Sequence, residues 1–151
     1  MANTFTQLYV HIVFSVKGRK NALQTENKES LHKYITAIVQ KRNVKMMAIN
    51  SMPDHIHIFL GLCPDISVSD IVRDIKHSST NFINNKRWAN GIFYWQEGYG
   101  AFTYSQSQIN NVVKYIINQE IHHHKKTFRE EYIELLKLFN IQYDEKYLFD
   151  I

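Results

Sequence analysis

The stretch Pro53-Asp54-His55-Ile56-His57-Ile58-Phe59-Leu60 (PDHIHIFL, residues 53–60) carries the pattern that decides the fold. Residues 44–52 and residues 55–60 are both apolar, and Pro53-Asp54 separates them, so the two runs predict a β-hairpin. Because side chains alternate along a strand, Ile56, Ile58 and Leu60 are expected to face the core. His55 and His57 then share the opposite face of the same strand.

The segments on either side of this hairpin complete a βαββαβ order. Residues 6–17 alternate as a strand does, and residues 25–42 carry apolar side chains at helical spacing. Ser67, with Asp70 three residues later, predicts the start of a helix that extends to residue 86, and a fourth strand is expected near residues 101–104. We therefore predict an α+β fold of ferredoxin-like arrangement, in which helices cover one face of an antiparallel sheet and the other face can hold a site.

Two further helices are predicted after the sheet. Residues 106–126 are expected to form one helix that carries Tyr115, with a core stripe of Val113, Ile116, Ile117 and Ile121. Tyr115 and Gln119 are four residues apart, so they lie one above the other beside that stripe. Thr127 with Glu130 predicts the capped start of a last short helix that ends near residue 139.

The composition fits a single domain over residues 1–151 with a substantial core. The chain is 44% hydrophobic, has two prolines and five glycines, and carries a net charge of +4, which favours a polyanionic partner. Its one cysteine, Cys63, excludes an intramolecular disulfide and indicates a cytosolic protein. Neither a signal peptide nor an apolar run of about 20 residues is evident, so we expect a cytoplasmic, nucleoid-associated protein without a membrane segment.

Two pairs of residues are candidates for chemistry. His55 and His57 are spaced about 6.5–7 Å apart along the strand, close enough for two imidazoles to bind one metal ion. Tyr115 is a candidate nucleophile because a phenol can form a covalent intermediate, and Gln119 offers a neutral oxygen ligand. Each pair also has a simpler interpretation, namely two solvent-facing histidines on an amphipathic strand, and a boundary tyrosine beside a surface glutamine.

Together, a His-x-His strand and a later Tyr-x-x-x-Gln helix resemble the HUH endonuclease superfamily, and within it the small single-tyrosine transposases of bacterial insertion sequences. The resemblance covers nearly the whole chain, including residues 11–14, 53–57, 98–102 and 115–119. It implies that His55, His57 and Gln119 hold one divalent cation, Mg²⁺ or Mn²⁺. It also implies that Tyr115 attacks single-stranded DNA, leaving a 5′-phosphotyrosine link and a 3′ hydroxyl.

The same resemblance implies partners for the chain. These enzymes act on single-stranded DNA with hairpin ends, and they work as homodimers in which the tyrosine helix can reach across to the other subunit. Candidate DNA contacts follow from residue type: a polar stripe suited to phosphates, aromatic rings suited to unpaired bases, and a histidine just past Gln119. They are Arg73, Lys76, Ser78, Trp95, Tyr99 and His122. Three other histidines, His11, His32 and His77, are expected to be structural or surface residues.

Two alternative functions are weighed against this resemblance. The first, a histidine-triad hydrolase, is disfavoured, because that pattern requires a third histidine where this strand has Phe59. A domesticated or inactive relative that only binds DNA hairpins would keep the fold and lose the reaction. A covalent protein–DNA adduct in a denaturing gel separates an active enzyme from such a binding protein.

Overall fold

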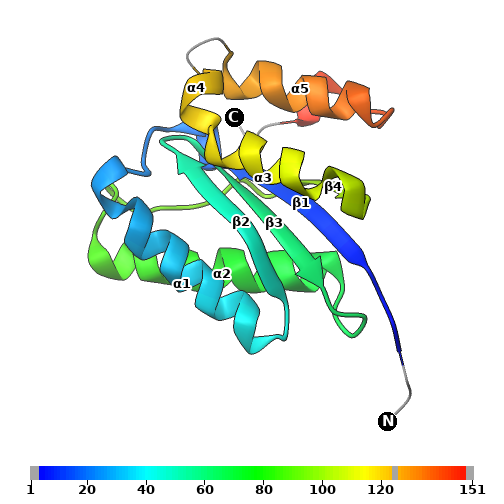
Figure 1. Ribbon diagram of the computed structural model, residues 1–151. Coiled ribbons are helices and arrows are strands. Elements are labelled where there is room, and N and C mark those ends of the chain that lie inside the picture. The colour runs from blue at the N-terminus through cyan, green and yellow to red at the C-terminus, as the bar shows by residue number, and fades with distance from the viewer. Residues whose placement is uncertain (1–3, 124–125, 149–151) are drawn as a thin grey trace.

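The structure, a computed structural model, describes residues 4–123 and 126–148 (Figure 1). Its centre is a four-stranded antiparallel sheet in the order β2-β3-β1-β4, with α1 joining β1 to β2 and α2 joining β3 to β4. This is the predicted ferredoxin-like order. The elements are β1 (Leu8–Ser15), α1 (Lys28–Lys41), β2 (Lys45–Met52), β3 (His55–Leu62), α2 (Val68–Lys86) and β4 (Gly100–Tyr104).

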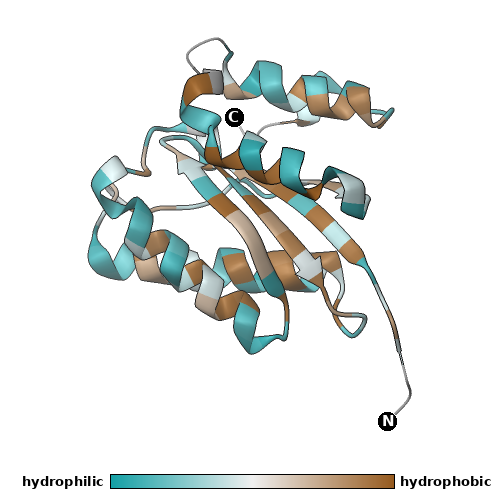
Figure 2. Cartoon of the chain, in the orientation of Figure 1, coloured by the Kyte–Doolittle hydropathy of each residue, from teal (hydrophilic) through white to brown (hydrophobic). Residues whose placement is uncertain are grey.

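The helices α1 and α2 cover one face of the sheet, as predicted (Figure 1). Every second residue of β1 and β3 points into this layer, where Ile12, Phe14, Ile56 and Ile58 are fully buried. Leu31, Ile35 and Val39 of α1 meet them at helical spacing. Figure 2 shows the matching pattern, with hydrophobic residues along the strands and hydrophilic residues on the outer side of α1.

The opposite face of the sheet is covered by two helices, and the candidate site lies between them and the sheet. The helix α3 (Ile109–Ile117) packs Val112 and Ile116 against Ala48 and Phe59. The helix α5 (Phe128–Leu138) lies over Val13 and Phe102, and its apolar side consists of Phe128, Tyr132, Leu135 and Leu136. This face therefore carries apolar side chains that favour a covering layer, which the sequence argument did not include.

The predicted single helix over residues 106–126 is interrupted. A 3₁₀ turn (Gln106–Gln108) precedes α3, and α4 (Gln119–His123) follows after a break at Asn118. Asn50 of β2 explains the break, because its Nδ2 donates to the carbonyl oxygens of Ile116 (2.9 Å) and Ile117 (3.2 Å). In an unbroken helix those carbonyls would accept from the amides four residues further on.

The predicted core stripe of this helix is correct in part, because Ile116 is buried and Val113 packs against the same cluster. Ile117 and Ile121 are 59% and 61% exposed, whereas Val112 and Ile116 are buried. The predicted helix caps are confirmed: Ser67 accepts from the amide of Asp70, and Thr127 forms a capping box with Glu130. Shorter 3₁₀ turns occur at Lys17–Arg19, Thr25–Asn27 and Glu145–Tyr147. Within the described residues, no helix has the length and apolar character needed to cross a bilayer.

Candidate active site

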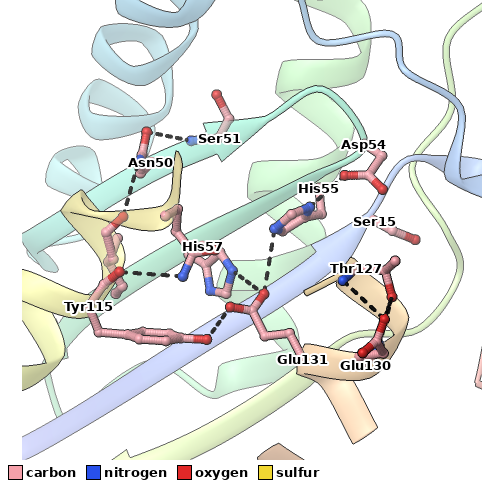
Figure 3. Close-up of polar contacts among 12 residues, drawn as sticks. Ser15, Asn50, Ser51, Asp54, His55, His57, Tyr115, Thr127, Glu130 and Glu131 are labelled. Carbon is pink, nitrogen blue, oxygen red and sulfur yellow. Dashed lines mark hydrogen bonds and ion pairs between the residues drawn. The ribbon is translucent and has the colours of Figure 1, made fainter. Parts of the chain in front are cut away.

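The two histidines of β3 are buried beneath α3 and α5 and point toward one centre. His55 and His57 are both fully buried, and their Nε2 atoms lie 3.6 Å and 3.1 Å from Oε1 of Glu131 (Figure 3). The Nδ1 atoms face away from this centre. His55 Nδ1 lies 2.6 Å from Asp54 Oδ1, and His57 Nδ1 lies 2.7 Å from His11 Nε2.

This arrangement suits metal binding by both rings. Histidine ligands in metal sites hold the ion with one nitrogen and form a hydrogen bond with the other, which fixes the ring and its tautomer. Burial lowers the pKa of His55 to about 4, despite the neighbouring Asp54, so the neutral ring that can bind a cation is favoured. His11, predicted to be a structural or surface residue, is fully buried and pairs with His57.

Glu131 of α5 belongs to this site, although the sequence patterns did not predict it. It is 4% exposed, and its carboxylate lies between the two histidines and Tyr115, whose hydroxyl donates to Oε2 (Figure 3). Candidate ligand atoms of His55, His57 and Glu131 all lie within 4.8 Å of one another, so this buried group could hold a metal ion. The spacing contained a signal: Glu131 is three residues after Phe128 and four before Leu135, on the apolar side of the helix.

Tyr115 comes from α3 and reaches the same centre. Its ring meets that of His57 edge-on with centroids 5.9 Å apart, and its hydroxyl contacts Glu131. Burial, together with the negative charge of Glu131, raises the pKa of Tyr115 above its ordinary value. The phenol is therefore protonated at neutral pH, and its proton must leave when the oxygen acts as a nucleophile.

Gln119 is the first residue of α4 and is fully buried. Its Nε2 donates to the backbone carbonyl of Tyr115 over 3.4 Å, and the two side chains also interact. The structure thus brings Gln119 beside the tyrosine, as its spacing predicted. Its role as a metal ligand stays a prediction.

Four of the six candidate DNA contacts line one hollow of about 440 Å³ over α2 and residues 94–99. They are Arg73, Lys76, Trp95 and Tyr99. Trp95 is nevertheless buried in the core, where its ring packs against Phe14 and Phe93, so the prediction that it stacks on an unpaired base is wrong. Ser78 is half-buried on α2 and does not belong to the lining. The backbone of His122 belongs to α4, and its side chain lies outside what the structure describes.

The two cations of this hollow have different surroundings. Lys76 Nζ donates to the carbonyl oxygens of Gln96 (2.7 Å), Glu97 (3.0 Å) and Gly98 (2.8 Å), so it fixes the segment that follows Trp95. The Arg73 side chain is 69% exposed and lies 3.2 Å from Asp70. Arg73 is therefore better placed for an approaching phosphate than Lys76.

Comparison with known proteins gives consistent matches. Residues 4–119 match the family described as "Transposase IS200 like". The chain is 26% identical over 120 residues to the ISDra2 transposase TnpA of Deinococcus radiodurans, covering 75% of this chain and 84% of that protein. It is 24% identical over 128 residues to the transposase of insertion sequence element IS200 from Salmonella typhimurium, covering 80% and 84%.

Two solved structures share the fold. A crystal structure described as a transposase from Deinococcus radiodurans R1 has a TM-score of 0.62 at 24% identity, covering 79% of this chain and 95% of that one. A REP-associated tyrosine transposase bound to a REP hairpin also has a TM-score of 0.62, at 18% identity, covering 82% and 73%.

Proposed function

The chain belongs to the IS200-like transposase family, and we propose that it cleaves and rejoins single-stranded DNA with Tyr115 as the nucleophile and a bound divalent metal ion. The observation that carries this proposal is the convergence of the Tyr115 hydroxyl with His55, His57 and Glu131 in one buried site (Figure 3). A nucleophile beside a cluster of metal ligands is what metal-assisted phosphoryl transfer requires.

The residues at this centre fit a divalent cation. Two neutral imidazoles and one carboxylate form a mixed nitrogen and oxygen donor set, and the hydrogen bonds at both Nδ1 atoms orient the rings for it. We propose His55 and His57 as ligands, with Gln119 as a further one on the strength of the family resemblance. Mg²⁺ or Mn²⁺ bound here would polarise the scissile phosphate and balance the charge that develops on it.

The reaction needs no nucleotide cofactor. The Tyr115 hydroxyl loses its proton as its oxygen attacks phosphorus and forms a new P–O bond, while the bond from phosphorus to the 3′ oxygen breaks with its electron pair; the proton lost and the proton gained by the 3′ oxygen balance. The products are a 5′-phosphotyrosine link and a strand that ends in a 3′ hydroxyl once that oxygen takes up a proton. Attack by the 3′ hydroxyl of another strand on the same link reverses these bond changes, so joining conserves the energy of the phosphodiester.

The proposed substrate is single-stranded DNA that folds into hairpins. The support is the structural relative bound to a REP hairpin, together with the net charge of +4 and the hollow that Arg73 and Tyr99 line. This hollow lies over α2, whereas Tyr115 lies on the other face of the sheet. If a hairpin is bound at the hollow, the single-stranded DNA next to it must therefore pass around the edge of the sheet to reach Tyr115. We further propose a homodimer, as the resemblance implies.

Covalent capture tests the proposal. Labelled single-stranded oligonucleotides with hairpins from the DNA that flanks the coding sequence are incubated with protein and Mn²⁺, and adducts are resolved in denaturing gels. Wild-type protein should form an adduct, and Tyr115→Phe should form none while still binding the DNA, because only the hydroxyl is lost. Tyr104→Phe is the matched control, since Tyr104 is a neighbouring phenol. An adduct that survives Tyr115→Phe, or one that requires Tyr104, would overturn the assignment.

A further inference from the structure

The two carboxylate oxygens of Glu131 face different partners (Figure 3). Oε1 is the oxygen near Nε2 of His55 and Nε2 of His57, and Oε2 accepts the hydrogen bond from the Tyr115 hydroxyl. Resting on the proposed function, we propose that Glu131 is a metal ligand through Oε1 and at the same time holds the nucleophile through Oε2. One side chain would thus set the tyrosine at a fixed place beside the ion.

The packing of α5 against the sheet positions the Glu131 side chain beside the two histidines. Phe128 stacks on the ring of His55 with centroids 4.2 Å apart, and Tyr132 lies against β4. The approach of Tyr132 is so close that a Cβ built on Gly100 would lie 2.7 Å from its ring, so β4 requires glycine there. With Leu135 and Leu136 also buried, these contacts fix the rotation of α5 and direct residue 131 at the histidines.

A buried carboxylate at this position lowers the stability of the fold unless its charge is compensated. Burying an ionised side chain is strongly unfavourable unless it is paired or binds a metal, and an apolar residue would suit this side of the helix better. The groups around the Glu131 carboxylate include two imidazoles and a phenol. A divalent cation bound to Oε1 would add positive charge directly beside this buried carboxylate.

Glu131 lies outside the part of the chain that matches the family. That match covers residues 4–119, which contain His55, His57, Tyr115 and Gln119, whereas Glu131 follows on α5. Metal binding by Glu131 would add a negative charge to a donor set that is otherwise neutral. It follows that this chain should bind a divalent cation more tightly than His55, His57 and Gln119 alone would allow.

The first experiment measures metal affinity without DNA. The full chain is titrated with Mn²⁺, and free Mn²⁺ is followed by electron paramagnetic resonance. Glu131→Gln, which preserves shape and removes the charge, should weaken Mn²⁺ binding by roughly tenfold or more. Glu134→Gln on the same helix is the control, because Glu134 is exposed and pairs with Lys126, and it should bind as the wild type does. Unchanged Mn²⁺ affinity in a folded Glu131→Gln protein, checked by thermal unfolding, would overturn the inference.

The second experiment follows the nucleophile itself. Tyrosines are labelled with ¹³C at the carbon bearing the hydroxyl, and the Tyr115 resonance is assigned from its loss in Tyr115→Phe. Diamagnetic Mg²⁺ should shift this resonance in the wild type, and Glu131→Ala should abolish the shift, since the link between ion and hydroxyl is removed. If Mg²⁺ shifts the Tyr115 resonance equally in the wild type and in Glu131→Ala, the positioning role is overturned.

These outcomes are separable from failure of the proposed function. A Glu131→Gln protein that binds Mn²⁺ and captures DNA like the wild type leaves Tyr115 as the nucleophile and removes only the role of Glu131. An adduct that survives Tyr115→Phe overturns the proposed function, whatever Glu131 does.

Discussion

His11 Nε2 lies 2.7 Å from His57 Nδ1, and the two rings stack with centroids 5.0 Å apart and 18° between their planes. His57 can bind a cation through Nε2 only when its hydrogen is on Nδ1. His11 must then accept that hydrogen with Nε2. Burial lowers the pKa of His11 well below its ordinary value, which favours the neutral ring that can accept. His11 is therefore placed to orient His57 at the proposed metal site.

Replacing His11 by Phe should weaken Mn²⁺ binding by roughly 10- to 100-fold, because the ring of His57 loses the partner that fixes its tautomer. His11→Gln should keep more of the affinity, since its carboxamide oxygen can accept the same hydrogen. Mn²⁺ titration gives the affinities, and ¹⁵N resonances of the metal-free protein report the tautomer of His57. Equal affinities for the Phe variant and the wild type would show that His11 only fills space.

Local patterns in the sequence predicted much of this site. The alternation around residues 53–60 placed His55 and His57 on one face, and the four-residue spacing brought Gln119 to Tyr115. Glu131 and His11 were missed because their roles depend on distant packing. The pairing of β1 with β3 places His11 beside His57, and the packing of α5 on the sheet places Glu131 beside both histidines of β3. Both contacts join residues that are far apart in the sequence, so a local repeat of apolar residues cannot predict them.

Metal removal should abolish DNA cleavage, and Mn²⁺ or Mg²⁺ should restore it, because the phosphate loses the charge that polarises it. His57→Ala should remain inactive at any practical metal concentration. Gln119→Ala should recover in part with excess metal, since both imidazoles and Glu131 remain. The rate of adduct formation against metal concentration measures this. Undiminished cleavage in EDTA would contradict a metal-dependent reaction.

Arg73 and Lys76 should respond differently to alanine substitution. Arg73→Ala should lower the salt dependence of single-stranded DNA binding by about 0.7 in the log–log slope, the value for one phosphate contact. Lys76→Ala should instead lower the free energy of unfolding by roughly 1–3 kcal/mol, because three carbonyls lose a charged donor. Binding at several salt concentrations and urea unfolding separate the two effects. An unchanged slope for Arg73→Ala would leave it as surface charge only.

His32 should make the fold sensitive to mild acid. Its Nε2 lies 2.9 Å from Ser51 Oγ, and burial, with Lys28 nearby, lowers the pKa of His32 to about 4. Between pH 6.5 and pH 4 the unfolded chain binds a proton that folded His32 does not, so stability falls as pH falls through this window. The loss is at most about 3.4 kcal/mol, and less because His32 is partly exposed to solvent. Urea unfolding at pH 7 and pH 4.5 should show a smaller fall for His32→Gln than for the wild type, and equal falls would contradict the prediction.

The candidate site is assembled within one chain, which predicts how mixed subunits behave. Asn50 holds the end of α3 on its own sheet through the carbonyls of Ile116 and Ile117, and Tyr115 contacts Glu131 of the same chain. Inactive Tyr115→Phe and inactive His57→Ala proteins are mixed under conditions in which subunits exchange. When the tyrosine acts on its own histidines, every site in a mixed dimer carries one lesion, so covalent capture should stay absent. Differently tagged subunits, purified through both tags, confirm that mixed dimers formed. An adduct in those dimers would pair an intact Tyr115 with the partner's intact histidines and would show that the tyrosine helix crosses between subunits.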